Sequence, residues 1–313
     1  MIINTGMRTD IPAFYSEWLC NRLKEGYVCT RNPYNQKQIT KYSLNPDVVD
    51  VIAFCTKNPA PMLPHMDLLK AYGQYWFVTI TPYGKEIEPN VPPKEQVVQS
   101  FVELSKIVGA DSMGWRFDPI FLNETYTIER HLHDFEQIAK SLAGSTHTCV
   151  ISFIDLYEKV KRNFPEVQTV PRQERLFLGE EMVKIAAKFD MTVRPCAEGN
   201  DLERFGADCS GCMTLSTFET AIHGRLNAPK KKSQRAECAC MLGNDVGQYD
   251  TCGHFCRYCY ANTSAAAVRQ NRSRHDPKSP LLVGRLRPED VVHEAKQSKW
   301  RDEQLSLFDW KHV

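Results

Sequence analysis

Long apolar runs and an export signal are both missing from this sequence. No stretch of about 18 consecutive apolar residues, the length from which a membrane helix is suspected, occurs in it. The segment Met1-Ile-Ile-Asn-Thr-Gly provides neither the basic nor the apolar region of a signal peptide. We therefore expect a cytoplasmic protein without a membrane partner. With 42% hydrophobic and 25% charged residues in 313, the composition is that of an ordinary globular chain.

Net charge is also nearly absent, but its distribution is uneven. The formal net charge is +1, whereas residues 225–287 hold twelve Lys or Arg against four Asp or Glu, a local charge of +8. One explanation is that these basic residues neutralise anionic thiolates and clusters. The other is that the region meets phosphate or another anion, which makes nucleic acid a candidate partner.

Cysteine, by contrast, is abundant. Twelve cysteines in a chain without an export signal argue against a disulfide framework and for metal binding or buried thiols. Four of them lie in apolar segments and are expected in the core, namely Cys20, Cys29, Cys55 and Cys149.

Three other cysteines are spaced for one polynuclear metal centre. Cys252, Cys256 and Cys259 form a CxxxCxxC sequence, with the aromatic residue Tyr258 before the last cysteine. Three thiolates on a cubane of four irons leave one iron without a protein ligand, and an open coordination position distinguishes a catalytic centre from a structural one. The alternative is a zinc site, for which His254 or Cys240 would have to supply a fourth ligand.

The CxxxCxxC spacing resembles the signature of radical S-adenosylmethionine (SAM) enzymes. The resemblance implies a [4Fe-4S] cluster whose open iron binds the amino and carboxylate groups of SAM, and reductive cleavage of SAM to a 5′-deoxyadenosyl radical. It also implies an electron donor such as flavodoxin or ferredoxin. In these enzymes the motif usually follows the first strand, whereas here it lies close to the C-terminus. The order of the parts is therefore expected to differ.

Apolar segments that end in polar residues alternate with segments of helical periodicity. The expected strands cover residues 2–7, 51–55, 75–80, 112–115, 149–153 and 191–193, the expected helices cover 13–24, 62–73, 94–108, 127–143, 155–163 and 172–189, and a hairpin covers 27–42. This alternation predicts an α/β fold of parallel βαβ units. Six units within residues 1–198 are similar to the partial (β/α)6 TIM-like barrel of radical SAM enzymes. A doubly wound sheet is the alternative.

The composition changes after Glu198. Residues 199–287 are rich in Gly, Cys and Lys and are expected to complete the active site as an iron–sulfur region, whereas residues 288–313 are expected to form a helix over 288–300 and a terminal tail. The carboxyl ends of parallel barrel strands share one rim, where active sites are assembled. The part of the chain that follows the sixth strand, called the tail below, can therefore reach this rim. It can place the loop that carries Cys252, Cys256 and Cys259, called the cysteine loop below, beside Arg8-Thr9-Asp10.

Charged residues at the ends of the expected strands are candidates for the active site. Arg and Lys suit the SAM carboxylate and substrate anions, and carboxylates suit ribose hydroxyls. The alternative for each is a structural salt bridge at the rim. The expected catalytic residues are Lys57, Arg116 and Asp118, and the expected cofactor-binding residues are Arg8, Asp10, Arg194, Glu198 and Tyr258.

A second group of cysteines precedes the cysteine loop. Four thiols would hold an auxiliary iron–sulfur cluster or a zinc ion. The expected ligands are Cys196, Cys212, Cys238 and Cys240, with Cys209 as a substitute. Spare buried thiols are the alternative, because CxC and CxxC pairs are weaker signals than the three-cysteine loop.

Further motifs extend over nearly the whole chain. They are Arg8-Thr9-Asp10-Ile11-Pro12-Ala13-Phe14-Tyr15, Thr56-Lys57-Asn58-Pro59, Trp115-Arg116-Phe117-Asp118-Pro119-Ile120, Cys196-Ala197-Glu198, Gln234-Arg235, Cys238-Ala239-Cys240 and Tyr249 to Ala261. They resemble a family of bacterial proteins of unknown function whose C-terminal cysteines are similar to the radical SAM cluster motif. Phe54-Cys55 and Gly6-Met7 depart from that family's pattern. More distantly, the strand ends are similar to those of spore photoproduct lyase relatives, which repair DNA.

The last residues contain one more motif. Gln304-Leu305-Ser306-Leu307-Phe308 resembles the peptide by which bacterial DNA-processing proteins dock on the replicative sliding clamp. The alternative is a tail that packs its apolar residues onto its own fold. Taken together, the sequence predicts a radical SAM enzyme with nucleic acid as the leading substrate class. An iron–sulfur electron-transfer protein and a zinc-stapled binding module are the competing hypotheses.

Overall fold

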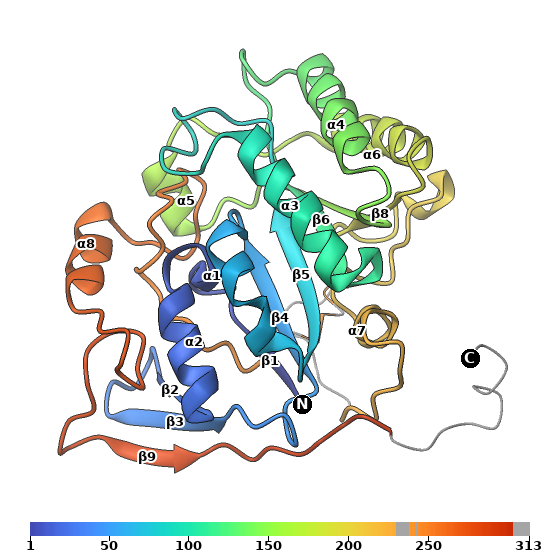
Figure 1. Cartoon of the computed structure of the whole chain (residues 1–313). Helices are drawn as coiled ribbons and strands as arrows, with labels where there is room; N and C mark the ends of the chain where they lie inside the picture. The colour runs from blue at the N-terminus through green and yellow to red at the C-terminus, as the bar shows by residue number, and fades with distance from the viewer. Residues whose placement is uncertain (230–237, 239, 242, 303–313) are drawn as a thin grey trace, which may run out of the picture.

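A six-stranded parallel sheet forms the centre of the computed structural model, which describes residues 1–229, 238, 240–241 and 243–302 (Figure 1). Its strands lie in the order β1 (Ile2–Asn4), β4 (Val51–Thr56), β5 (Gly73–Thr79), β6 (Met113–Ile120), β7 (Thr148–Phe153) and β8 (Thr192–Pro195). All six predicted strands are confirmed. Because the order follows the chain and never reverses, the doubly wound alternative is wrong.

The main sheet is open in the described part of the chain, since β1 and β8 lie at its two edges and do not pair with each other. The structure therefore establishes an α/β fold with a parallel sheet and does not show a closed barrel. β6 is longer than predicted, so that Arg116 and Asp118 lie within the strand and not after it.

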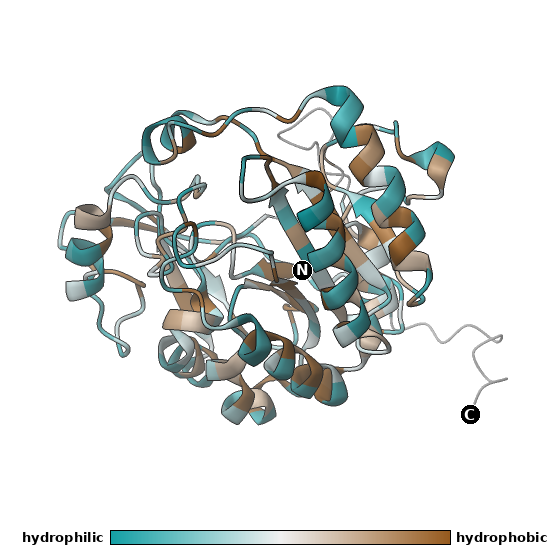
Figure 2. Cartoon of the chain, turned by 90° about the horizontal axis from the view of Figure 1, so that it is seen from above, coloured by the Kyte–Doolittle hydropathy of each residue, from teal (hydrophilic) through white to brown (hydrophobic). Residues whose placement is uncertain are grey.

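Helices connect these strands and cover the sheet. They are α1 (Ile11–Phe14), α2 (Ser16–Glu25), η1 (Ala60–Leu69), α3 (Lys94–Val108), η2 (Ala110–Ser112), α4 (Ile128–Leu142), α5 (Glu158–Asn163) and α6 (Arg172–Ala187). In Figure 2 the helices carry both apolar and polar residues, as helices with one face on a sheet do. The segment predicted as a helix over 62–73 is a 3-10 helix over 60–69, because Pro61 and Pro64 lack the N–H groups that α-helical bonding needs.

A small second sheet corrects one prediction. β2 (Tyr27–Arg31) and β3 (Gln38–Ser43) form the predicted antiparallel hairpin, and β9 (Val291–Glu294) pairs in parallel with β3. The helix predicted over 288–300 is therefore wrong. The β-branched Val291 and Val292 suit a strand, and β3 provides a pairing partner that no local pattern could reveal.

The C-terminal part of the chain returns across the molecule and packs into the same core. Figure 1 shows α7 (Leu215–Ala221) and α8 (Ala265–Ser273) on opposite sides of the fold. Between them Asp245 bridges to Asn4 of β1, and Val246 donates a backbone hydrogen bond of 2.9 Å to Asn4. Val246 and Leu282 belong to the main hydrophobic core. The tail therefore lies beside the free edge of β1.

The remaining short element is η3 (Glu203–Phe205). No helix in the described ranges combines the length and the apolar character that a membrane span requires.

Candidate active site

A cavity opens where the main strands end. Strands β4 to β7 and the loop after β1 supply wall residues, among them Thr9, Thr56, Thr79, Arg116 and Ser152. The cysteine loop forms the facing wall with Cys252, Cys256, Tyr258 and Cys259. The C-terminal motif therefore meets the strand ends in space, next to Thr9 and Asp10, although most of the chain separates them in sequence.

The predicted site residues divide into two sets. Those that line the cavity are Asp10, Lys57, Arg116, Asp118, Cys196, Cys252, Cys256, Tyr258 and Cys259. Arg8, Arg194, Glu198 and three of the predicted cysteines, Cys212, Cys238 and Cys240, lie outside the lining residues. Arg194 donates 2.8 Å to the Thr217 hydroxyl and pairs with Asp208 at 2.9 Å, and Glu198 pairs with Arg175 at 3.1 Å.

Arg8 contacts the tail close to the point where the tail meets β1. Its Nε is 4.0 Å from a carboxylate oxygen of Asp245, and its guanidinium lies 5.7 Å from the centre of the Tyr249 ring. Both partners come from the segment that bridges to β1. Arg8 therefore holds the returning tail against the first strand.

Asp10 and His254 join the loop after β1 to the cysteine loop. His254 Nε2 lies 2.9 Å from Asp10 Oδ2, and both side chains are buried. Asp10 also accepts hydrogen bonds from the backbone N–H of Ala13 at 3.0 Å and of Lys57 at 2.7 Å. The other ring nitrogen of His254 faces the Asn90 carbonyl at 3.3 Å. Both nitrogens of His254 therefore face oxygen acceptors, which leaves neither as a ready metal ligand.

Glu88 lies beneath the cysteine loop and gathers three partners. Lys57 Nζ lies 2.9 Å from Glu88 Oε1, Thr81 donates to the same oxygen at 2.6 Å, and the Tyr258 hydroxyl donates to it as well. Glu88 is only 4% exposed. Burial alone would raise the pKa of Glu88, but the Lys57 ammonium and these hydrogen bonds lower it. The ionised carboxylate of Glu88 therefore holds the Tyr258 side chain in place through this hydrogen bond.

The three loop thiols are buried in a way that disfavours the free thiolates. Burial raises the pKa of Cys252, Cys256 and Cys259, although the Lys57 ammonium opposes this at Cys256. A thiolate-bound metal would therefore have to displace protons from these sulfurs. The positive charge beside Cys256 would stabilise the anionic ligand that results.

Arg116 and Asp118 form a charged pair on the opposite wall. They are in direct contact, and the Ser152 hydroxyl donates to the Asp118 carboxylate. The Arg116 guanidinium also lies 4.8 Å from the centre of the Phe77 ring. Its Nε is buried and has no hydrogen-bond partner among the described residues. Arg116 therefore faces the cavity with a guanidinium whose Nε is satisfied by no described residue.

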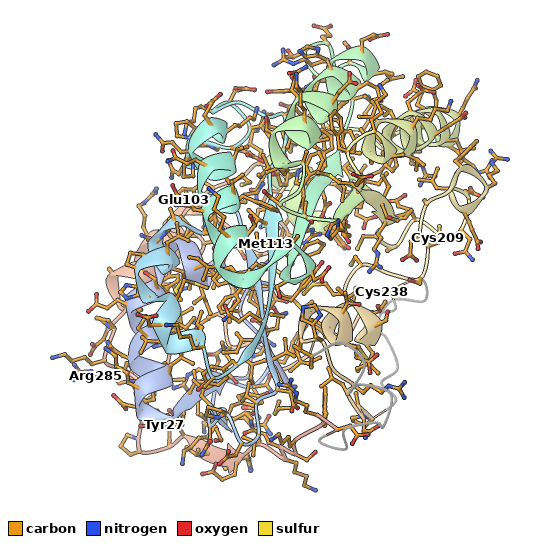
Figure 3. The ribbon with its side chains drawn as sticks, turned by 45° about the vertical axis from the view of Figure 1, so that its right-hand side comes forward. Tyr27, Glu103, Met113, Cys209, Cys238 and Arg285 are labelled. Carbon is orange, nitrogen blue, oxygen red and sulfur yellow. The ribbon has the colours of Figure 1, made fainter. Side chains whose placement is uncertain are left out.

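The second group of cysteines converges beside the cavity. Cys212 Sγ lies 3.5 Å from Cys196 Sγ and 3.0 Å from Cys240 Sγ. Hydrogen bonds from Cys196, Cys212 and Cys238 lower the pKa of Cys240. Cys209 has none of these partners and packs against the main core. Figure 3 shows it on a different segment from Cys238.

Several residues in and around the site were not predicted from the sequence. Glu88 stands in the loop Lys85-Glu86-Ile87-Glu88-Pro89, where nothing distinguishes it from an exposed acid. Tyr157 and Tyr260 line the cavity with exposed rings whose centres are 6.2 Å apart. Tyr260 directly follows the last cysteine of the motif, and that proximity was the one available signal.

Comparisons with known proteins agree with the family resemblance. No curated protein matches the chain, so the distant likeness to spore photoproduct lyase relatives stays a prediction. A family profile described as a domain of unknown function, DUF1848, matches residues 2–261. That match includes every strand of the main sheet and the three cysteines of the loop. The chain therefore belongs to the DUF1848 family.

Proposed function

We propose that this protein is a radical SAM enzyme that binds a [4Fe-4S] cluster through Cys252, Cys256 and Cys259. One observation carries the proposal: all three thiols of the CxxxCxxC loop line a single cavity at the carboxyl ends of parallel strands, together with Lys57 and Arg116. An electron-transfer cluster needs no such cavity. A site that must hold a cofactor and a substrate does.

The surroundings of His254 favour the cluster over the zinc alternative for this loop. Zinc would need a fourth ligand, and the two candidates were His254 and Cys240. The His254 nitrogens face Asp10 and Asn90, and Cys240 contacts Cys212 instead. Three thiols that lack these two candidates suit a centre with one open position.

When bound, the cluster and SAM would supply a 5′-deoxyadenosyl radical. The chain's own residues would hold the cysteine loop in place and orient the cofactor and the substrate. Glu88 and Lys57 fix Tyr258, and Asp10 fixes His254, so that the loop keeps its place on the wall. Arg116, whose guanidinium lines the cavity, would orient an anionic group of the cofactor or the substrate.

The unreversed order of six parallel strands supports a finer description of the fold. We infer a partial (β/α)6 barrel whose open side, between β1 and β8, is covered by the tail. This arrangement explains how a motif near the C-terminus can occupy the position that usually belongs to an N-terminal loop. A rearranged chain order would then preserve the geometry of the site.

We also propose a substrate class and an electron donor. Exposed cations on α8 and after it, including Arg269, Arg274 and Arg287, suit a nucleic-acid substrate. Flavodoxin or ferredoxin would supply the electron, and a cytoplasmic location would protect the cluster. The clamp-docking motif Gln304–Phe308 lies outside the described residues.

The test is anaerobic reconstitution with iron and sulfide, then reduction with dithionite in the presence of SAM. We expect 5′-deoxyadenosine from the wild-type chain and none from Cys256→Ala, with Cys149→Ala, a buried core cysteine, as the matched control. If a cluster forms but no deoxyadenosine appears, and SAM leaves the EPR spectrum of the reduced cluster unchanged, the electron-transfer hypothesis replaces this proposal.

A further inference from the structure

The second group of cysteines draws its members from distant parts of the chain. Cys196 follows β8, Cys212 precedes α7, and Cys238 and Cys240 lie in the segment that returns toward β1. Thiols from three separate segments meet in one place, where Cys212 Sγ lies 3.5 Å from Cys196 Sγ and 3.0 Å from Cys240 Sγ. Cys240 in turn is hydrogen-bonded by Cys196 and by Cys238. Thiols without a shared role would not be expected to lie in contact with one another.

The short distances distinguish between two kinds of metal centre. Zinc–sulfur bonds of about 2.3 Å in a tetrahedron place the sulfurs about 3.8 Å apart. In a cubane each thiolate binds a different iron, which separates the sulfurs further. No three Cys, His, Asp or Glu side chains in the described part of the chain are already spaced as ligands of one ion. The thiols around Cys212 would have to part by only several tenths of an ångström to accept zinc.

We propose that Cys196, Cys212, Cys238 and Cys240 bind a single tetrahedral zinc ion. This inference does not rest on the proposed reaction, and it selects zinc over a second iron–sulfur cluster. Zinc would bind the four thiolates and release their protons to solvent. The resulting anionic centre would lie near the Arg116 guanidinium, whose charge interacts with Cys196 and Cys212.

The position of the group indicates what the ion does. Cys196 follows the last strand of the sheet and also lines the cavity. Beyond Cys240, the chain reaches β1 at Asp245 and then enters the cysteine loop. A zinc ion at the four thiols would therefore fasten the returning tail to the end of β8. It would fix the path that carries Cys252, Cys256 and Cys259 to the strand ends.

The main experiment counts metals in full-length chains purified anaerobically. We expect about one zinc per wild-type chain, little zinc in Cys212→Ser, and unchanged zinc in Cys209→Ser. Cys209 is the control because it lies three residues away and contacts no thiol of the described residues. Cys256→Ala should lose iron and keep zinc. If Cys212→Ser loses iron and no zinc, the centre is an iron–sulfur cluster. If it loses neither metal, the thiols are spare, and either result overturns the proposal.

A second measurement guards against misfolding of Cys212→Ser. The wild-type chain expressed with cobalt in place of zinc should show the intense visible bands of tetrahedral cobalt with four thiolate ligands, and a thiol-free chelator competing for cobalt should remove them. Absence of these bands in a cobalt-loaded chain would contradict a tetrahedral thiolate site. Failure of SAM cleavage would leave both results intact, so the two proposals fail separately.

Discussion

The two groups of thiols both reach one cavity, the second through Cys196, and differ in what holds them. The cysteine loop is fixed mainly by contacts that do not involve sulfur. Asp10 binds His254, Glu88 binds Tyr258, and the Asn90 side chain donates to the Gly253 carbonyl at 2.8 Å. Among the described residues, the four-thiol group (Cys196, Cys212, Cys238 and Cys240) is held by contacts between its sulfurs and by backbone hydrogen bonds such as that from Met241 to the Met213 carbonyl, 2.8 Å.

The two groups therefore differ in how much a bound metal would contribute to folding. A loop fixed by the protein can hold a metal centre with one position open, because the fold does not depend on a fourth ligand. Segments joined mainly through thiols gain their order from the ion, and metal binding there contributes to folding. We therefore expect substitutions of the residues that hold the cysteine loop to lower the free energy of unfolding whether or not zinc is bound.

The largest effect is expected for Glu88→Gln. The substitution leaves the Lys57 ammonium buried without its counterion and weakens the contacts of Thr81 and Tyr258. Breaking a buried ion pair costs about 3–5 kcal/mol, so the free energy of unfolding, measured with urea under reducing conditions, should fall by about this amount. Zinc content should not change, because Glu88 touches none of the four thiols.

Two comparisons sharpen this prediction. Glu103→Gln, on the exposed side of α3 and labelled in Figure 3, should change stability little. Because the folded pKa of Glu88 is lower than the ordinary value of 4.5, its stabilising effect is present above pH 4.5 and is lost as pH falls through the folded pKa. The difference in free energy of unfolding between wild type and Glu88→Gln should therefore become smaller at acidic pH. A gap of under about 1 kcal/mol at neutral pH would mean that Glu88 is no anchor.

A smaller effect is expected for His254→Phe. The new ring can keep the packing against Phe14, whose ring centre lies 4.6 Å from that of His254, but it loses the bond to the buried Asp10. A hydrogen bond to a charged group contributes about 1.5–3 kcal/mol, and we expect unfolding to become easier by about this amount. Iron bound after reconstitution should fall while zinc stays constant.

The matched control for this variant is His133→Phe, because His133 is exposed on α4. Iron content, zinc content and stability should all stay close to wild type in the control. Loss of zinc from His254→Phe would contradict the separation of the two thiol groups, since it would mean that the loop and the four-thiol group are one cooperative unit.

The smallest effect is expected for Arg194→Gln on the four-thiol side. Arg194 pairs with the partly exposed Asp208, and such a pair contributes about 1 kcal/mol or less. Deoxyadenosine formation should survive in Arg194→Gln and should fall sharply in Arg116→Gln, whose side chain lines the cavity. If Arg194→Gln abolishes deoxyadenosine with both metals retained, Arg194 contacts the cofactor, as the sequence alone predicted.

Local sequence patterns were sufficient for most of the fold. The strands around Val51–Thr56 and Thr148–Phe153 are short apolar runs, and α3 and α4 have helical periodicity, which depends only on neighbouring residues. The same reasoning failed at Val291–Glu294. A few apolar residues fit a helix or a strand equally well, and the pairing with β3 decided between them.

The sequence by itself determined the order of the strands of the main sheet and the grouping of Cys252, Cys256 and Cys259, because these depend on residues close together in the chain. Only the tertiary structure decided that Glu88 lies under Tyr258, that His254 belongs to Asp10, and that Cys209 stands apart from its neighbour Cys212. Those outcomes depend on how the tail returns across the sheet, and such long-range packing leaves no periodic trace in the sequence.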